Sequence, residues 1–111
     1  MNSSTYYPKI QKIADTYGYE TQSRQCIEEM AELTVAINKY YRGMKDFRGH
    51  LNPPPLKKPL PLKELGNLVE EIADVQIMLW QMAYLLNADV VPIIEQKLDR
   101  QLERIEKCTN S

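Results

Sequence analysis

Two short acidic segments with the same pattern constrain this chain more than any other feature. The first, CIEEMAEL, covers residues 26–33, and the second, LVEEIADV, covers residues 68–75. At about 100° per residue, Glu29 and Glu32 share one stripe of a helix, and Glu71 and Asp74 share a stripe of another. Both stripes continue into apolar side chains. Charged residues that face solvent would instead lie on the opposite side of the helix from its apolar side chains. The pattern therefore predicts two helices whose acidic side chains lie next to the apolar core.

The remaining sequence indicates further helices and no sheet. It has no Asn-Gly or Asp-Gly turn and no sustained alternation of apolar and polar residues. Capping residues and breakers predict helices over residues 8–16, 21–42, 62–86 and 89–107, with Gly18 ending the first and Asp89 capping the last. Most of the seven prolines lie between the second and third helices. We therefore expect one all-α domain over 1–111, a four-helix-type bundle with its core at about 20–107. A long proline-rich loop at about 45–61 would join the two acidic helices.

Composition excludes several classes of partner. The chain has 111 residues and a formal net charge of −1, so no overall field draws it to a nucleic acid polymer or an anionic membrane. Its longest apolar run, IMLW at 77–80, is far shorter than the ~20 residues of a membrane span. Two separated cysteines and a single histidine support neither a zinc site nor a disulfide framework. We expect a cytoplasmic protein with no membrane partner.

Buried carboxylates need compensation, and two kinds are available. Basic side chains could pair with the acids as ordinary ion pairs between helices; the candidates are Lys39, Arg42, Lys97 and Arg100. Alternatively, carboxylates at i and i+3 on two facing helices could converge on a hard cation, and oxygen ligands alone suit Mg²⁺ or Mn²⁺. A di-iron centre would need Glu-x-x-His pairs, and His50 lies in the proline-rich loop. Two acidic pairs, each in an apolar face, favour the metal.

The last predicted helix carries a complementary basic row. Helical spacing places Lys97, Arg104 and either Arg100 or Gln101 along one side. Beside a metal–carboxylate cluster, these side chains would meet phosphate oxygens. The alternative is solvated charge paired with acids of the same helix, namely Glu95, Asp99 and Glu103.

The two acidic segments and the basic row together resemble the MazG-like all-α nucleoside triphosphate pyrophosphatases. EEMAE followed by EEIAD resembles the EExxE…ExxD signature of that superfamily, and the apolar run VQIMLWQMAYLL also matches. The family's later Lys, Asn and Arg correspond here to Lys97, Gln101 and Arg104, with glutamine in place of asparagine. The resemblance covers roughly residues 22–104. The gap between the two motifs is longer than is usual in the family, because of the proline-rich loop.

The resemblance implies Mg²⁺-dependent hydrolysis of a nucleoside triphosphate (NTP or dNTP) to the monophosphate and pyrophosphate. Its implied ligands are Glu29, Glu32, Glu71 and Asp74, with Glu28 or one of the ligands accepting a proton. Lys97, Arg100, Gln101 and Arg104 would bind substrate. The competing interpretation is a non-catalytic helical module that binds nucleotide or another protein; the intact acidic positions favour the enzyme.

The resemblance also implies a homodimer or homotetramer. The residues themselves support this, because both acidic helices are apolar over more of their circumference than one short bundle can cover. The side chains outside the acidic stripes are Ile27, Ala31 and Thr34 on the first helix, and Ile72, Ile77 and Trp80 on the second.

Overall fold

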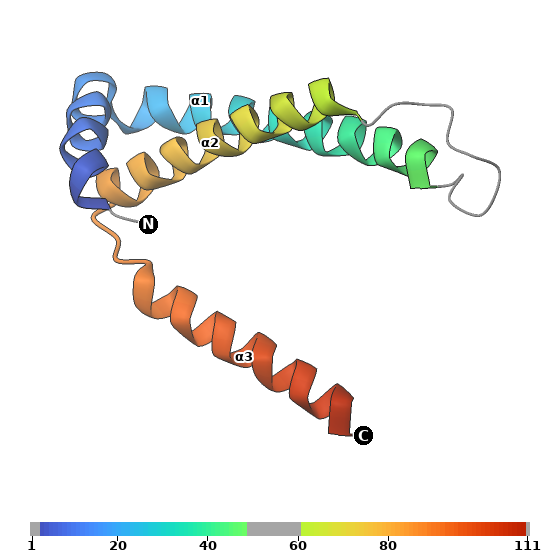
Figure 1. The fold of residues 1–111 in the computed structure, drawn as a ribbon. Coiled ribbons are helices and arrows are strands. Elements are labelled where there is room, and N and C mark those ends of the chain that lie inside the picture. Colours follow the sequence, from blue (N-terminus) through green and yellow to red (C-terminus); the bar gives the residue numbers. More distant parts are fainter. Residues whose placement is uncertain (1–2, 49–60, 111) are drawn as a thin grey trace.

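The computed structural model describes residues 3–48 and 61–110, and its regular structure in these ranges is entirely helical. The elements are α1 (Ser3–Arg48), α2 (Leu62–Leu85) and α3 (Val91–Asn110) (Figure 1). The all-α prediction is confirmed at this level. Residues 49–60, most of the expected proline-rich loop, lie outside the described ranges. No described helix is long and apolar enough to cross a membrane.

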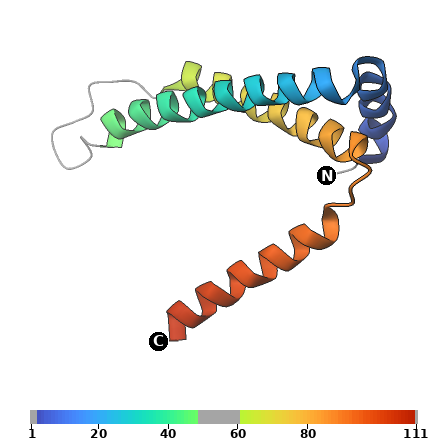
Figure 2. The same ribbon diagram turned by 180° about the vertical axis from the view of Figure 1, so that it is seen from behind.

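A break at Gly18 divides α1 into two arms. Gly18 has φ 83° and ψ 169°, a conformation that lies outside the helical region and that glycine adopts without a Cβ penalty. The short N-terminal arm turns sharply away from the long arm in both views (Figures 1 and 2). These arms correspond to the first two predicted helices. The long arm runs to Arg48, six residues beyond the predicted end at Arg42, because Gly43 is accommodated inside the helix.

The long arm of α1 and the whole of α2 pack side by side and antiparallel; we call this pair the hairpin (Figures 1 and 2). Its apolar core is narrow, and its buried members between the two helices are Cys26, Ala36, Val75 and Met78. A polar contact joins the helices beside them, since Gln22 Nε2 donates to Gln81 Oε1 at 2.7 Å and both glutamines are buried. A buried amide pair that satisfies itself avoids a desolvation penalty and fixes the register of the two helices.

Aromatic contacts hold the N-terminal arm against the end of α2. Tyr6 stacks near Trp80 with ring centroids 6.1 Å apart, and Tyr7 meets the Tyr84 ring edge-on at the same separation. The Tyr84 hydroxyl lies 2.9 Å from both carboxylate oxygens of Asp15, to which it donates. The sharp bend at Gly18 therefore allows the N-terminal arm to pack against the end of α2.

The third helix stands apart. It contacts neither α1 nor α2, and every residue from Val91 to Thr109 is exposed (Figure 1). The expected Asp89 cap is present in part, because Asp89 Oδ1 accepts a hydrogen bond from the Val91 N–H at 3.2 Å. The last predicted helix thus exists, but it does not complete a four-helix bundle within one chain.

Two glycines of the hairpin give a matched test of this packing. A Cβ at Gly43 would lie 2.7 Å from Pro61 Cβ, whereas a Cβ at Gly66 would meet nothing within 4 Å. Gly66→Ala should therefore stabilise the protein by roughly 0.5–1 kcal/mol through helix propensity. Gly43→Ala should lose more through the clash than it gains, and destabilise by about 1–3 kcal/mol. Chemical denaturation of both variants measures the difference, and equal stabilisation by both would contradict the close approach of Gly43 to Pro61.

Candidate metal centre

Three carboxylates from the two acidic segments converge between α1 and α2. One oxygen each from Glu29, Glu71 and Asp74 lies within 4.8 Å of the others. Glu29 comes from α1, whereas Glu71 and Asp74 lie one turn apart on α2. The i and i+3 spacing places both α2 acids on the side that faces α1, as the sequence predicts.

Two oxygens of this cluster are buried and have no hydrogen-bond partner. They are Oε2 of Glu29 and Oε2 of Glu71. The other oxygen of Glu29 accepts a hydrogen bond from Gln25 Nε2 at 2.8 Å. Within residues 3–48 and 61–110, none of the carboxylates forms an ion pair with a lysine or arginine. The alternative of ion pairs with Lys39, Arg42, Lys97 or Arg100 is therefore not what these helices adopt.

The cluster makes Glu71 harder to ionise. Burial raises the pKa of Glu71 above its ordinary value, and the negative charges of Glu32, Asp74, Glu29 and Glu70 raise it further, in that order. Like charges held close together disfavour each other's ionised form, and a cation placed among them would reverse the effect.

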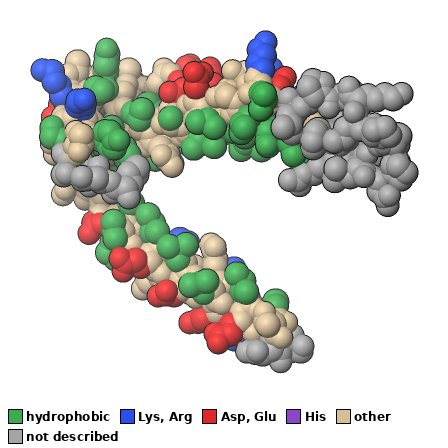
Figure 3. All heavy atoms as spheres, in the orientation of Figure 1, with side chains coloured by type: hydrophobic (Ala, Val, Ile, Leu, Met, Phe, Trp, Pro, Cys, Tyr) green, Lys and Arg blue, Asp and Glu red, His purple; other side chains and the backbone are tan. Residues whose placement is uncertain are grey.

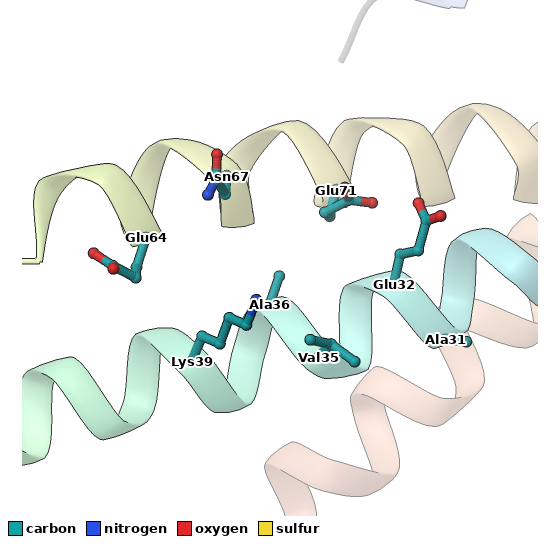
Figure 4. Close-up of a pocket in the computed structure, with 8 residues that line it drawn as sticks. All are labelled: Ala31, Glu32, Val35, Ala36, Lys39, Glu64, Asn67 and Glu71. Carbon is teal, nitrogen blue, oxygen red and sulfur yellow. The ribbon is translucent and has the colours of Figure 1, made fainter.

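A hollow of about 390 Å³ opens beside the cluster. Glu32 and Glu71 point toward one another at one end of it (Figure 4). Lys39, Glu64 and Asn67 line the rest together with the apolar Ala31, Val35 and Ala36. Glu32 is exposed and is not one of the three closest carboxylates, so it occupies the rim of the site. The hollow gives the acids an open side from which a ligand could approach.

The other predicted site residues lie away from the cluster in this chain. Glu28 is exposed and outside the group of converging carboxylates. Lys97, Arg100, Gln101 and Arg104 are on α3, which touches neither acidic helix. One chain therefore assembles the acidic half of the predicted site and leaves the basic half apart.

Sequence reasoning missed some residues around the site. Glu64 lines the hollow, as does Lys39, which the sequence suggested only as an ion-pair partner of the acids. Gln81 joins α2 to α1 through its hydrogen bond with Gln22. Gln81 could have been found, because it continues the stripe of Glu71, Asp74 and Met78 at helical spacing. A glutamine in that stripe needs a polar partner across the interface, and Gln22 occupies the matching stripe of α1.

The residues present are suited to a hard divalent cation. All the converging donors are carboxylate oxygens, the ligand type that Mg²⁺ and Mn²⁺ prefer. The two buried oxygens without partners, on Glu29 and Glu71, are the atoms that such an ion would satisfy.

The raised pKa predicts how stability depends on pH without metal. A folded-state pKa above the unfolded value means that the native state binds the extra proton, so stability falls as pH rises through this window. With a chelator present, the melting temperature should thus increase as pH is lowered from 7 toward the ordinary range of a glutamate. Glu71→Gln should remove part of that increase. Glu64→Gln is the control, because Glu64 lines the hollow but is not one of the converging carboxylates, and this variant should retain the increase. Melting curves at several pH values measure the slopes, and identical slopes for wild type and Glu71→Gln would contradict the coupling.

Comparison with known proteins provides no relative for this chain. No family model matches it, and neither a curated protein nor a solved structure does so. The function is therefore inferred from the site and from the sequence motifs.

Proposed function

We propose that the protein is a Mg²⁺-dependent nucleoside triphosphate pyrophosphohydrolase, which cleaves an NTP or dNTP of the cytoplasmic pool between the α and β phosphates. The single observation that carries the proposal is the convergence of Glu29, Glu71 and Asp74 with two buried oxygens that have no partner. The resemblance of EEMAE and EEIAD to the MazG-like signature adds the reaction type.

The proposal gives each acid a role. Glu29, Glu71 and Asp74 would hold Mg²⁺ (or Mn²⁺), with Glu32 joining them from the rim of the hollow. Bound Mg²⁺ would neutralise phosphate charge and lower the pKa of water at the site. Glu28, which neighbours Glu29 on α1, or one of the four proposed ligands would accept the proton of the attacking water.

The triphosphate also needs cationic side chains, because divalent ions must already balance the carboxylates. Lys97, Arg100 and Arg104 are proposed for this role, and Gln101 would offer its neutral amide to the substrate beside them. Since α3 does not contact the hairpin of its own chain, the proposal includes a homodimer or homotetramer, in which hairpins of two copies form the four-helix bundle.

The proposal is tested by incubating the purified protein with a panel of NTPs and dNTPs in the presence of Mg²⁺. Both pyrophosphate and the monophosphate should appear in equal amounts from the preferred substrate, and a chelator should stop their release. Nucleotide binding without any release would support the non-catalytic module instead. Release of inorganic phosphate with a diphosphate product would place the cleavage at the wrong bond and refute the proposed reaction.

A further inference from the structure

Another pocket lies where the N-terminal arm, the end of α2 and the start of α3 come together, and we call it the elbow pocket (Figure 1). Its volume is about 680 Å³, within the roughly 300–1,000 Å³ of pockets that hold small ligands. Figure 3 shows apolar side chains on both sides of this junction, whereas acidic side chains gather farther along the hairpin.

The elbow pocket is separate from the candidate metal centre. It shares no lining residue with the acidic cluster or with the hollow beside that cluster. Along α2, Trp80 of the elbow pocket lies about 9 Å beyond Asp74 of the cluster. The proposed hydrolysis therefore gives this pocket no role.

Aromatic rings line the elbow pocket from two elements. Tyr6 and Tyr7 come from the N-terminal arm, and Trp80 and Tyr84 come from α2. The rings of Tyr6 and Trp80 are nearly parallel, at 20°, whereas those of Tyr7 and Tyr84 are nearly perpendicular, at 89°. Tyr6 and Tyr7 are still 48% and 44% exposed, so much of their ring surface is available. The rings thus face in more than one direction, as they do in the aromatic cages that hold ammonium ions.

The charge of the elbow pocket is negative. Asp89 is the one charged side chain among the described residues that line it, and none of these is a lysine or arginine. Behind the Tyr84 ring, both carboxylate oxygens of Asp15 accept from the Tyr84 hydroxyl at 2.9 Å. This hydrogen bond, together with burial and the Asp15 charge, raises the pKa of Tyr84 above its ordinary value. A phenol that donates to a carboxylate has a more electron-rich ring, which attracts a cation more strongly.

The start of α3 does not make the elbow pocket an anion site. A helix N-terminus attracts negative charge through its free N–H groups. Here the Val91 N–H already donates to Asp89 Oδ1 at 3.2 Å, and the Ile94 N–H donates to the Val90 carbonyl at 2.9 Å. Pro92 has no N–H to offer. A phosphate group at this position would meet a carboxylate and no basic side chain.

A flat neutral ligand such as a nucleobase also fits poorly between the rings. A planar ring between two others needs them about 7 Å apart, twice the ~3.5 Å of van der Waals contact. The ring centroids of Tyr6 and Trp80 are only 6.1 Å apart. A rounded ammonium group needs no such slot, because it is attracted to the outer face of a single ring.

We propose that the elbow pocket binds a small organic ammonium ion, quaternary or alkylated. Its methyl or methylene groups would contact the rings of Tyr6, Tyr7 and Trp80, and its charge would be balanced by Asp89 and by the electron-rich Tyr84 ring. Apolar walls remove part of the water from such a cation, which strengthens its attraction to the rings. One ligand would touch the N-terminal arm, α2 and the start of α3 together.

The first test is a titration with choline, followed by the fluorescence of Trp80, the single tryptophan of the chain. Choline should change the emission until the pocket is saturated, whereas NaCl at the same ionic strength should not. The alcohol in which a tert-butyl group replaces the trimethylammonium group of choline has the same shape without the charge. It should bind about tenfold more weakly. Equal binding of the two, or no change with choline, would overturn the proposal.

Asp89→Asn separates the charge of this residue from its role as a helix cap. Asparagine caps a helix as well as aspartate does, so α3 should begin as in the wild type. The variant should bind choline roughly threefold more weakly and the neutral alcohol unchanged. Asp99→Asn is the matched control, because Asp99 is an exposed acid of α3 that does not line the pocket. Undiminished choline binding in Asp89→Asn would refute the recognition of charge at this site.

Tyr6→Leu removes one ring while it keeps an apolar side chain. It should weaken choline binding about fivefold, whereas Tyr41→Leu, which changes an exposed tyrosine outside the pocket, should leave it unchanged. Melting curves identify a variant whose arm has detached, and Asp89→Asn decides in that case. Glu71→Gln should bind choline like the wild type, since Glu71 belongs to the acidic cluster. Loss of choline binding in Glu71→Gln would place the ion at the cluster and overturn the elbow site.

Discussion

Glu71→Gln is expected to abolish pyrophosphate release, by about 100-fold or more, while the protein remains folded. Glu71 contributes one of the three converging oxygens and one of the two buried oxygens without a partner. Its amide counterpart has nearly the same shape but no charge, so it removes a hard anionic ligand. The substitution also removes repulsion from Glu32, Asp74 and Glu29, the charges that raise the pKa of Glu71. Without metal, the variant should therefore melt no lower than wild type.

Glu70→Gln is the matched control for this experiment. Glu70 is the neighbouring residue on α2, is exposed, and is not among the converging carboxylates. The control removes the same charge from the same helix turn, and it should retain most of the activity. Equal loss of activity in both variants would mean that activity depends on the total negative charge of the segment and not on the position of Glu71 in the cluster. Unfolding of Glu71→Gln would identify Glu71 as a structural residue.

Local sequence signals were sufficient for the helices. The periodicity of the second acidic segment predicted a helix at 62–86, and α2 covers Leu62–Leu85. Gly18 was predicted to end a helix, and it breaks α1 where the backbone takes a positive φ. The end of the long arm was less predictable, because the close approach of Gly43 to Pro61 depends on a contact between residues far apart in the chain.

The position of the last helix could not be predicted in the same way. Periodicity gives the apolar stripe of α3 but not the surface that covers it, and a helix with one apolar side packs equally well on its own chain or on another. Hydrogen bonds from Leu86, Asn87 and Ala88 close the end of α2, and the direction of α3 depends on the backbone of the short connection that follows them, which no composition rule specifies. The sequence therefore predicted a bundle, whereas one chain contains a hairpin and a separate helix.

The acidic half of the site was predictable for a physical reason. Carboxylates that share a stripe with core residues must face the neighbouring helix, so Glu29, Glu71 and Asp74 had to meet if the two helices paired. The distinction between Glu29 and Glu32 was not predictable, since both lie on the same stripe. A rotation of α1 by a few tens of degrees decides which of them is half-buried and which remains at the rim.

Millimolar Mg²⁺ is expected to raise the melting temperature of the wild-type protein by roughly 10 °C or more over the value in chelator. A ligand that binds only the native state stabilises it by about 2.7 kcal/mol at one hundred times its Kd, and each kcal/mol is worth about 4–8 °C in a domain of this size. The gain comes from Glu29 and Glu71, whose buried oxygens have no partner within the described chain, and from the repulsion at Glu71 that a cation removes.

Screening by salt must be separated from binding, because any electrolyte weakens repulsion between exposed acids. NaCl at the ionic strength of the Mg²⁺ sample is the control for wild type, and it should give only a small part of the shift. Glu71→Gln should lose most of the Mg²⁺ effect, whereas Lys97→Ala should keep it, since the lysine lies on α3 and contributes no oxygen to the cluster. An equal shift with NaCl, or an undiminished shift in Glu71→Gln, would mean that the cluster binds no ion. The carboxylates would then be a repulsive feature of the hairpin, and the proposed chemistry would lose its physical basis.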